Sequence, residues 1–137
     1  MNKDFDAWNL QKKQVENRKL HHPKKREIWW ANLGVNVGSE QDGVGIFFER
    51  PVLILKKFSN GTCLIVPLTK SDADNKFYFN LEPHGYRSRI ILSQMRVIST
   101  RRLTRNIERL DSATFSKLVE ALEVINGFCN NKKPPRR

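Results

Sequence analysis

Few residues of this chain could form a disulfide bond or bind a metal ion. Its 137 residues include 2 cysteines, Cys63 and Cys129, and 3 histidines. So few thiols fit a reducing cytoplasm, and we expect each cysteine to be a small core or surface residue; a disulfide between them is the less favoured alternative. His21 and His22 adjoin in a basic linker, His84 stands alone, and no CxxC or HxxxH spacing occurs. We therefore expect no structural zinc ion, and neither another metal nor a cofactor.

The sequence also lacks a long apolar run. No stretch approaches the roughly 20 apolar residues that a membrane span needs. The N-terminus, MNKDFDAW, places acids and a tryptophan where a signal peptide needs an apolar core. The length predicts one domain that is large enough to bury a core of its own. These features together predict a soluble, cytoplasmic protein.

Negative charge is scarce. The chain has 25 Lys and Arg against 14 Asp and Glu, a net charge of +11, which favours a polyanionic partner. Residues 1–26 hold eight basic and three acidic residues, and residues 132–137, KKPPRR, add four basic ones. Residues 87–109 hold seven arginines, no lysine and one acid. Because the planar fork of arginine fits phosphate oxygens, this segment favours phosphate contact; an exposed charged face is an equally good reading.

Hydrophobic periodicity predicts a mainly β fold with a C-terminal helix. Asp111 can cap a helix that begins at Ser112 and carries apolar residues at helical spacing, and Gly127 suits its end. Strands are predicted over residues 27–33, 47–56, 62–68, 77–81 and 89–99. Short turns between them indicate a mainly antiparallel, strongly bent sheet or small barrel.

Two further segments flank this pattern. Residues 4–20 contain no glycine or proline and predict an appended helix with a lightly apolar face, capped by Asp4 or Asp6. Residues 34–45 contain four glycines and must form a loop.

Standard catalytic motifs are missing. A Ser-His-Asp triad would need His84 and has no GxSxG beside it, and Val44-Gly45 replaces the Lys-Ser/Thr of a phosphate loop. The polar residues that remain fall at loops and strand ends, where a scaffold presents functional groups. They are the GSEQ segment (residues 38–41), Glu49, Arg50, Thr69, Ser88, Ser93 and Gln94. The simpler reading is that Arg50 pairs with Glu49 or a neighbouring acid and that Thr69 satisfies a turn.

These residues also carry a family resemblance. The segments EIWWANLG, GSEQ, RPVLIL, IVPLT, SRIILSQMRVIS and RRL follow one another in this order, before the C-terminal helix. In this combination they resemble the MazF/PemK (Kid-like) toxins of bacterial type II toxin–antitoxin systems, over about residues 26–126. The resemblance implies an SH3-like barrel, usually a homodimer, that cleaves single-stranded RNA, most often mRNA, without a metal ion. It also implies a cognate antitoxin as protein partner.

The resemblance further implies which residues form the site. Arg50 of RPV and Thr69 after the third strand match the catalytic pair. In the family the GSEQ loop borders the RNA site and Gln94 lines the same groove. Together with polar residues near them, the predicted RNA-binding positions are Ser39, Glu40, Gln41, Glu49, Ser88, Ser93, Gln94 and Arg96. Family members cleave by attack of a 2′-hydroxyl on the adjacent phosphate, which leaves a 2′,3′-cyclic phosphate and a 5′-hydroxyl. Arg50 suits stabilisation of the added charge, because its guanidinium stays protonated; Glu40 and Glu49 are the candidates for the general base.

The chain departs from the family pattern in four places. The segment DGVGIFFE between GSEQ and RPV is longer than usual, and Ser93 stands where some members have an acid. The helical extension, residues 1–25, and the basic tail, residues 130–137, flank a toxin-like domain over residues 26–129. Both additions could extend the RNA surface, cover a partner site or do neither.

Two other functions remain open on the same fold. One is a gyrase poison that does not cut RNA, as in the related CcdB toxins, and the other is a general RNA-binding module. Retention of Arg50 and Thr69 argues against the first. Phe47 and Phe48 could stack on splayed bases, although at least one is expected in the core because strand neighbours face opposite sides.

Overall fold

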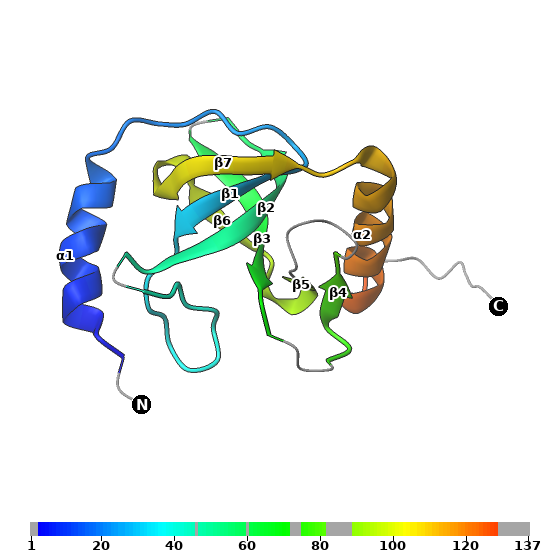
Figure 1. Ribbon diagram of the computed structural model, residues 1–137, viewed down its shortest axis with the longest axis horizontal. Helices are drawn as coiled ribbons and strands as arrows, with labels where there is room; N and C mark the ends of the chain where they lie inside the picture. The colour runs from blue at the N-terminus through cyan, green and yellow to red at the C-terminus, as the bar shows by residue number, and fades with distance from the viewer. Residues whose placement is uncertain (1–2, 46, 60, 72–74, 82–88, 129–137) are drawn as a thin grey trace.

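The fold is a strongly bent antiparallel sheet with one helix at each end. The computed structural model describes residues 3–128 apart from residues 46, 60, 72–74 and 82–88. Helix α1 (Phe5–Glu16) stands at one end of the sheet and helix α2 (Ser112–Ile125) at the other (Figure 1). The strands are β1 (Glu27–Asn32), β2 (Glu49–Lys57), β3 (Thr62–Thr69), β4 (Tyr78–Asn80), β5 (Arg89–Ile91), β6 (Arg96–Ser99) and β7 (Leu103–Arg109).

The strands are ordered β4-β5-β3-β2-β1-β7, and β6 also pairs with β3. All strand pairings among the described residues are antiparallel. This confirms the expected mainly β fold with a C-terminal helix and an extra N-terminal helix.

The run VLIL in β2 is continuous because both faces of the strand are buried. Leu53 and Leu55 belong to a core that β2 and its neighbours form with Phe115 and two leucines of α2. Val52 and Ile54 point the other way, into a second core inside the bend of the sheet. Strand residues alternate between faces, so a strand that is covered on both sides must be apolar at every position. This strand therefore anchors the residues at its start, Glu49 and Arg50.

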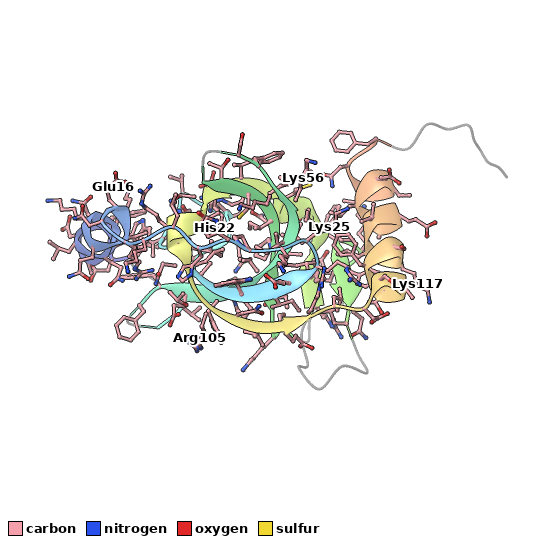
Figure 2. All side chains as sticks on the ribbon, turned by 90° about the horizontal axis from the view of Figure 1, so that it is seen from above. Glu16, His22, Lys25, Lys56, Arg105 and Lys117 are labelled. Carbon is pink, nitrogen blue, oxygen red and sulfur yellow. The ribbon has the colours of Figure 1, made fainter. Side chains whose placement is uncertain are left out.

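Both helices begin at the residues that the sequence indicates. The carboxylate of Asp111 accepts the Thr114 N–H at 3.0 Å, and that of Asp4 accepts the Ala7 N–H at 2.8 Å, which satisfies backbone donors that have no partner within the helix. Gly127 has a φ of 74° and follows α2, as a C-terminal glycine should. Glu16 on α1 and Lys117 on α2 lie at opposite ends of the molecule (Figure 2).

The structure corrects the predicted elements in three places. Helix α1 ends at Glu16, four residues earlier than predicted. The predicted strand 89–99 is divided into β5 and β6 by a short 3-10 helix, Leu92–Gln94 (η1), because β5 and β6 pair with different halves of β3. Strand β7 was not predicted at all. Register shifts interrupt its pairing with β1, so its sequence lacks the alternation that marks a regular strand.

The described residues contain no helix that is both long enough and apolar enough to span a membrane. Two of the features singled out in the sequence, His84 and the basic tail 130–137, lie outside the described residues, as does Cys129.

Candidate active site

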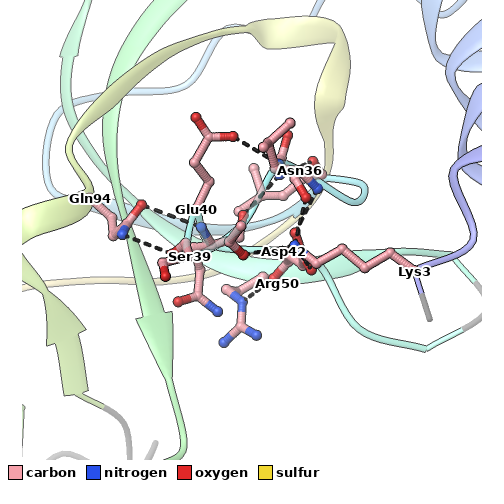
Figure 3. A network of polar contacts seen from close by, with 11 residues as sticks. Lys3, Asn36, Ser39, Glu40, Asp42, Arg50 and Gln94 are labelled. Carbon is pink, nitrogen blue, oxygen red and sulfur yellow. Dashed lines mark hydrogen bonds and ion pairs between the residues drawn. The ribbon is translucent and has the colours of Figure 1, made fainter. Parts of the chain in front are cut away.

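Arg50 lies at the start of β2 and is held by backbone carbonyl groups of two other segments. Its Nε donates to the carbonyl oxygen of Asp42 at 2.6 Å (Figure 3). Its Nη1 donates to the carbonyl oxygen of Leu68 at 3.1 Å. Ala31 of β1 lies opposite Arg50 in the sheet. Pro51 restricts the preceding residue to extended geometry. The sequence therefore places this guanidinium at the rim of the apolar strand and not inside it.

Gln41 of the GSEQ segment contacts the same guanidinium. With its side-chain amide oriented so that the oxygen faces Arg50, this oxygen accepts from Nη2 at 2.8 Å and from Nε at 3.1 Å. Together the three acceptors use one N–H group on each of Nε, Nη1 and Nη2. The guanidinium carries five N–H donors in all. The remaining N–H groups can donate to the oxygens of a phosphate.

Burial sets the electrostatics of Arg50. Desolvation lowers the pKa of its guanidinium below its ordinary value, while the charges of Asp42 and Tyr78 act in the opposite direction. Because an arginine side chain keeps its proton at neutral pH, the pocket holds a permanent positive charge with reduced hydration. Such a charge interacts more strongly with an anion than a fully solvated one does.

Thr69 lies at the end of β3, beside Arg50. The two line one cavity of about 310 Å³ together with Trp30, Val44, Pro51, Leu68, Lys70 and Ser71. The hydroxyl oxygen of Thr69 accepts the Ser71 N–H at 3.2 Å, which is the turn contact that the simpler reading of the sequence expects. Its own O–H can still donate to a ligand in the cavity. The structure thus brings the two predicted catalytic residues together.

Gln41 also lines a second cavity of about 310 Å³. Its lining residues are Asn36, Glu40, Gln41, Ser93, Gln94, Met95 and Arg96, which include five of the predicted RNA-binding residues. Gln94 holds the GSEQ loop in place: its Oε1 accepts the Gln41 N–H and its Nε2 donates to the Ser39 carbonyl, each at 3.3 Å. Glu40 accepts the Val37 N–H through Oε1 at 3.0 Å.

Glu49 lines neither of the two cavities. Its Oε1 lies 3.2 Å from the hydroxyl of Thr104 and 3.8 Å from Nη1 of Arg105, both on β7. Adjacent strand residues face opposite sides, so Glu49 points away from the face that carries Arg50. The described residues therefore contain no Glu49–Arg50 ion pair, and the simpler reading of Arg50 as the partner of Glu49 is not supported. Ser88 lies outside the described residues.

Two residues that contribute to the site, Asp42 and Trp30, are not among those predicted from the sequence. The main-chain carbonyl of Asp42 accepts a hydrogen bond from Arg50. This role depends on the path of the backbone, so the type of side chain at this position does not indicate it. Trp30 lines the cavity with Arg50 and has Arg105 over its ring at 5.0 Å. Two consecutive tryptophans in one strand could have indicated this, since one of them must face away from the core.

No metal centre is apparent in the described part of the chain, where no three His, Cys, Asp or Glu side chains gather as a metal site would need. The predicted catalytic residues are an arginine and a threonine, with a glutamate as the candidate general base.

Comparisons with known proteins identify relatives of this chain. A family model described as "PemK-like, MazF-like toxin of type II toxin-antitoxin system" matches residues 24–125. Endoribonuclease EndoA of Bacillus subtilis is 32% identical over 112 residues, which span 74% of this chain and 91% of EndoA.

Solved structures share the fold at lower identity. MazF of Deinococcus radiodurans superposes with a TM-score of 0.66 at 20% identity, over 78% of this chain and 98% of that one. An endoribonuclease from a mycobacterial species, solved in complex with its cognate antitoxin, gives a TM-score of 0.62 at 15% identity, over 79% and 98% of the two chains. The family match covers most of the sequence, and the alignment with EndoA covers about three quarters of it. The chain therefore belongs to the PemK-like, MazF-like toxins of type II toxin–antitoxin systems.

Proposed function

We propose that this chain is a sequence-specific endoribonuclease toxin that cleaves single-stranded RNA without a metal ion, through attack of a 2′-hydroxyl on the adjacent phosphate. The observation that carries the proposal is the half-buried Arg50 guanidinium, fixed by carbonyl groups beside Thr69 in one cavity. Membership of the toxin family and the relation to an endoribonuclease support it. The products would be a 2′,3′-cyclic phosphate and a 5′-hydroxyl.

Arg50 supplies charge stabilisation in this reaction. The attacked phosphate gains negative charge as the new P–O bond forms, and donors that are already oriented stabilise that charge without reorganising. The carbonyl groups of Asp42 and Leu68 hold the guanidinium in a fixed orientation. One such preorganised donor is typically worth roughly 3–4 kcal/mol of barrier.

Thr69 and Glu40 complete the proposed machinery. The hydroxyl of Thr69 donates to a phosphate oxygen or to the attacking 2′-oxygen. Of the two carboxylates considered as general base, Glu40 is the better placed. It lines the second cavity together with Gln41, which contacts Arg50, whereas Glu49 contacts β7. The second cavity, with Ser93, Gln94 and Arg96, would hold nucleotides next to the cleaved bond; Ser39 and Ser88 remain predicted contacts of the same RNA.

The proposed partners follow from the relatives. A mycobacterial neighbour is solved with its cognate antitoxin, and we propose an antitoxin for this chain, together with the homodimer that the resemblance implies. We place the activity in the cytoplasm, where messenger RNA is available. The toxin domain would begin near residue 26, next to the start of the family match at residue 24, with residues 1–25 as an extension and residues 130–137 as a basic tail.

The test is cleavage of mixed-sequence RNA by the purified protein in excess chelator. Cleavage should persist, should be abolished by a 2′-deoxy substitution at the cut nucleotide, and should leave a cyclic phosphate. Arg50→Ala should reduce kcat by roughly 10²–10³-fold while circular dichroism stays unchanged.

Arg109→Ala is the matched control, because it removes the same charge from the exposed end of β7, opposite Glu27 and away from the cavity. Equal losses in both variants would reduce Arg50 to a general electrostatic role. If the protein binds RNA without cutting it, or inhibits supercoiling by gyrase, the nuclease proposal is wrong.

A further inference from the structure

Two of the additions to the family pattern contact each other in the structure. Residues 3–18 of the N-terminal extension lie beside the long loop, residues 33–48, which runs from β1 to β2 and contains most of the longer segment DGVGIFFE (Figure 1). The family match begins only at residue 24, so the contacting part of the extension is outside it. The extension acts on the loop at three places. These are the tip (residues 36–42), the base (Gly34) and the return into β2 (Phe47 and Phe48).

Lys3 binds the tip of the loop. Its Nζ donates to the carbonyl oxygens of Asn36 at 2.6 Å and Gly38 at 2.9 Å, and lies 3.2 Å from Oδ2 of Asp42 (Figure 3). The side chains of Lys3 and Asp42 are only 26% and 25% exposed. One ammonium group therefore ties together both sides of the loop, with all three of its N–H groups supplied with acceptors.

Trp8 packs against the base of the loop. It is 5% exposed, and a Cβ at Gly34 would lie only 2.0 Å from its ring, so the ring rests directly on the backbone of the loop. Its ring centroid is 5.6 Å from that of Phe48. Phe48 has a φ of 54°, a conformation that is unfavourable for a bulky residue and persists only when surrounding contacts hold it. This residue lies two positions before Arg50.

Arg18 holds the return of the loop through a buried amide. Its Nη1 donates to Oδ1 of Asn32 at 2.5 Å, and Nδ2 of Asn32 donates to the carbonyl oxygen of Phe47 at 2.7 Å. Asn32 is 1% exposed. Buried amides are stabilising only when their hydrogen bonds are satisfied, so the extension completes a polar link that fixes the loop next to β2.

The loop in turn holds Arg50. The carbonyl oxygen of Asp42 accepts from Nε of Arg50, while the carboxylate of the same residue accepts the Asn36 N–H and pairs with Lys3. Backbone hydrogen bonds in both directions between Val44 and Glu49 bring this part of the loop against the start of β2. A shift of Asp42 would therefore move an acceptor of the guanidinium.

We propose that the N-terminal extension is a positioning element for Arg50, which acts through the long loop, with Lys3 and Trp8 as the positioning residues. The proposal rests on the proposed function, in which Arg50 stabilises the charge of the transition state. Neither Lys3 nor Trp8 is itself among the residues that line the two cavities. Their loss should lower the rate of the chemical step more than it lowers RNA affinity, because small misplacements of a catalytic group reduce turnover.

The decisive comparison is Lys3→Met against Lys13→Met in the full chain. Both variants lose one positive charge from the extension, but Lys13 is exposed and its side chain has no contact with the loop among the described residues. Lys3→Met should lower kcat by roughly tenfold with KM unchanged, and Lys3→Arg should restore most of it. Lys13→Met should change neither constant. Trp8→Ala should act like Lys3→Met, and Trp8→Phe should retain most of the activity.

Hydrogen exchange supplies a readout that does not depend on activity. The amides of Gly43, Val44, Phe48 and Glu49 are hydrogen-bonded within the loop and its return. They should exchange faster in Lys3→Met than in the parent protein or in Lys13→Met.

The outcomes separate the two proposals. If the parent protein does not cleave RNA, the proposed function fails, and the exchange rates alone decide whether the extension orders the loop. Equal rises of KM in Lys3→Met and Lys13→Met would show that the extension is only an electrostatic anchor for RNA. Unchanged kcat and unchanged loop exchange in Lys3→Met would overturn the positioning role.

Discussion

Replacement of Gly34 by alanine tests whether α1 packs on the loop in solution. Gly34 has a φ of 76°, and its added Cβ would meet the ring of Trp8 at 2.0 Å. Gly38 provides a matched control in the same loop: its φ is 57°, but nothing lies within 4 Å of the position of a Cβ. The two substitutions share the backbone cost, and only the first adds a steric conflict.

The expected losses in the free energy of unfolding follow from the backbone cost and the steric conflict. A left-handed backbone costs a residue with a Cβ roughly 1–2 kcal/mol relative to glycine, so Gly38→Ala should lower the free energy of unfolding by about that amount. An inserted group in a packed site costs about 1–3 kcal/mol more. Gly34→Ala should therefore lose about 2–5 kcal/mol, a large fraction of the stability of an ordinary domain.

Urea denaturation of both variants, followed by circular dichroism, measures the difference. The same pair of substitutions in a Trp8→Ala background isolates the contact, because the steric term then vanishes and only the shared backbone cost remains. Equal losses for Gly34→Ala and Gly38→Ala in the parent chain would refute the packing of Trp8 on Gly34. A gap between them that survived in the Trp8→Ala background would refute its assignment to Trp8.

Two further predictions concern the cores. Leu118→Ala removes a fully buried side chain from the face of α2 and should reduce the free energy of unfolding by about 2–5 kcal/mol; a loss below about 1 kcal/mol in urea denaturation would contradict the packing of α2 on the sheet. Burial raises the pKa of the Cys63 thiol from its ordinary 9.0 to about 11, so in a Cys129→Ser variant it should resist thiol reagents at pH 8 until denaturant is added. Fast labelling of the folded protein would show instead that the thiol is accessible. Because the unfolded chain loses the thiol proton at a lower pH than the folded chain does, the contribution of Cys63 to stability should fall as pH rises between about 9 and 11.

The sequence predicts most of the scaffold because its signals are local. The cap at Asp111, the apolar spacing of α2 and the uninterrupted run in β2 each fix one element, and the structure confirms them. Strand β7 was missed because register shifts remove its alternation. The division of the segment 89–99 was missed because it depends on which half of β3 each part meets, which is a tertiary property.

The site residues also fall into those that the sequence indicates and those that depend on tertiary structure. Arg50 and Thr69 could be named as the catalytic pair through the family resemblance that the RPV and PLT segments carry, and the structure places both in one cavity. The role of Asp42 could not be named, since it acts through its main-chain carbonyl. Glu49 looked close to Arg50 because the two are adjacent in sequence, yet the alternation of a strand directs them to opposite faces.

The extension and the long loop are best understood as one unit, because neither has enough contacts to be stable alone. A helix of 12 residues with two buried side chains is too short to persist in water by its own hydrogen bonds. The loop holds Phe48 in a strained conformation, and Gly43 packs so closely that a Cβ there would lie 1.7 Å from the Phe48 carbonyl oxygen. Trp8 is buried against this loop, and the loop is supported from the extension by Trp8, Lys3 and Arg18, in addition to its contacts with Gln94. A family member with the longer loop but without the helix would therefore need another support for the same arginine.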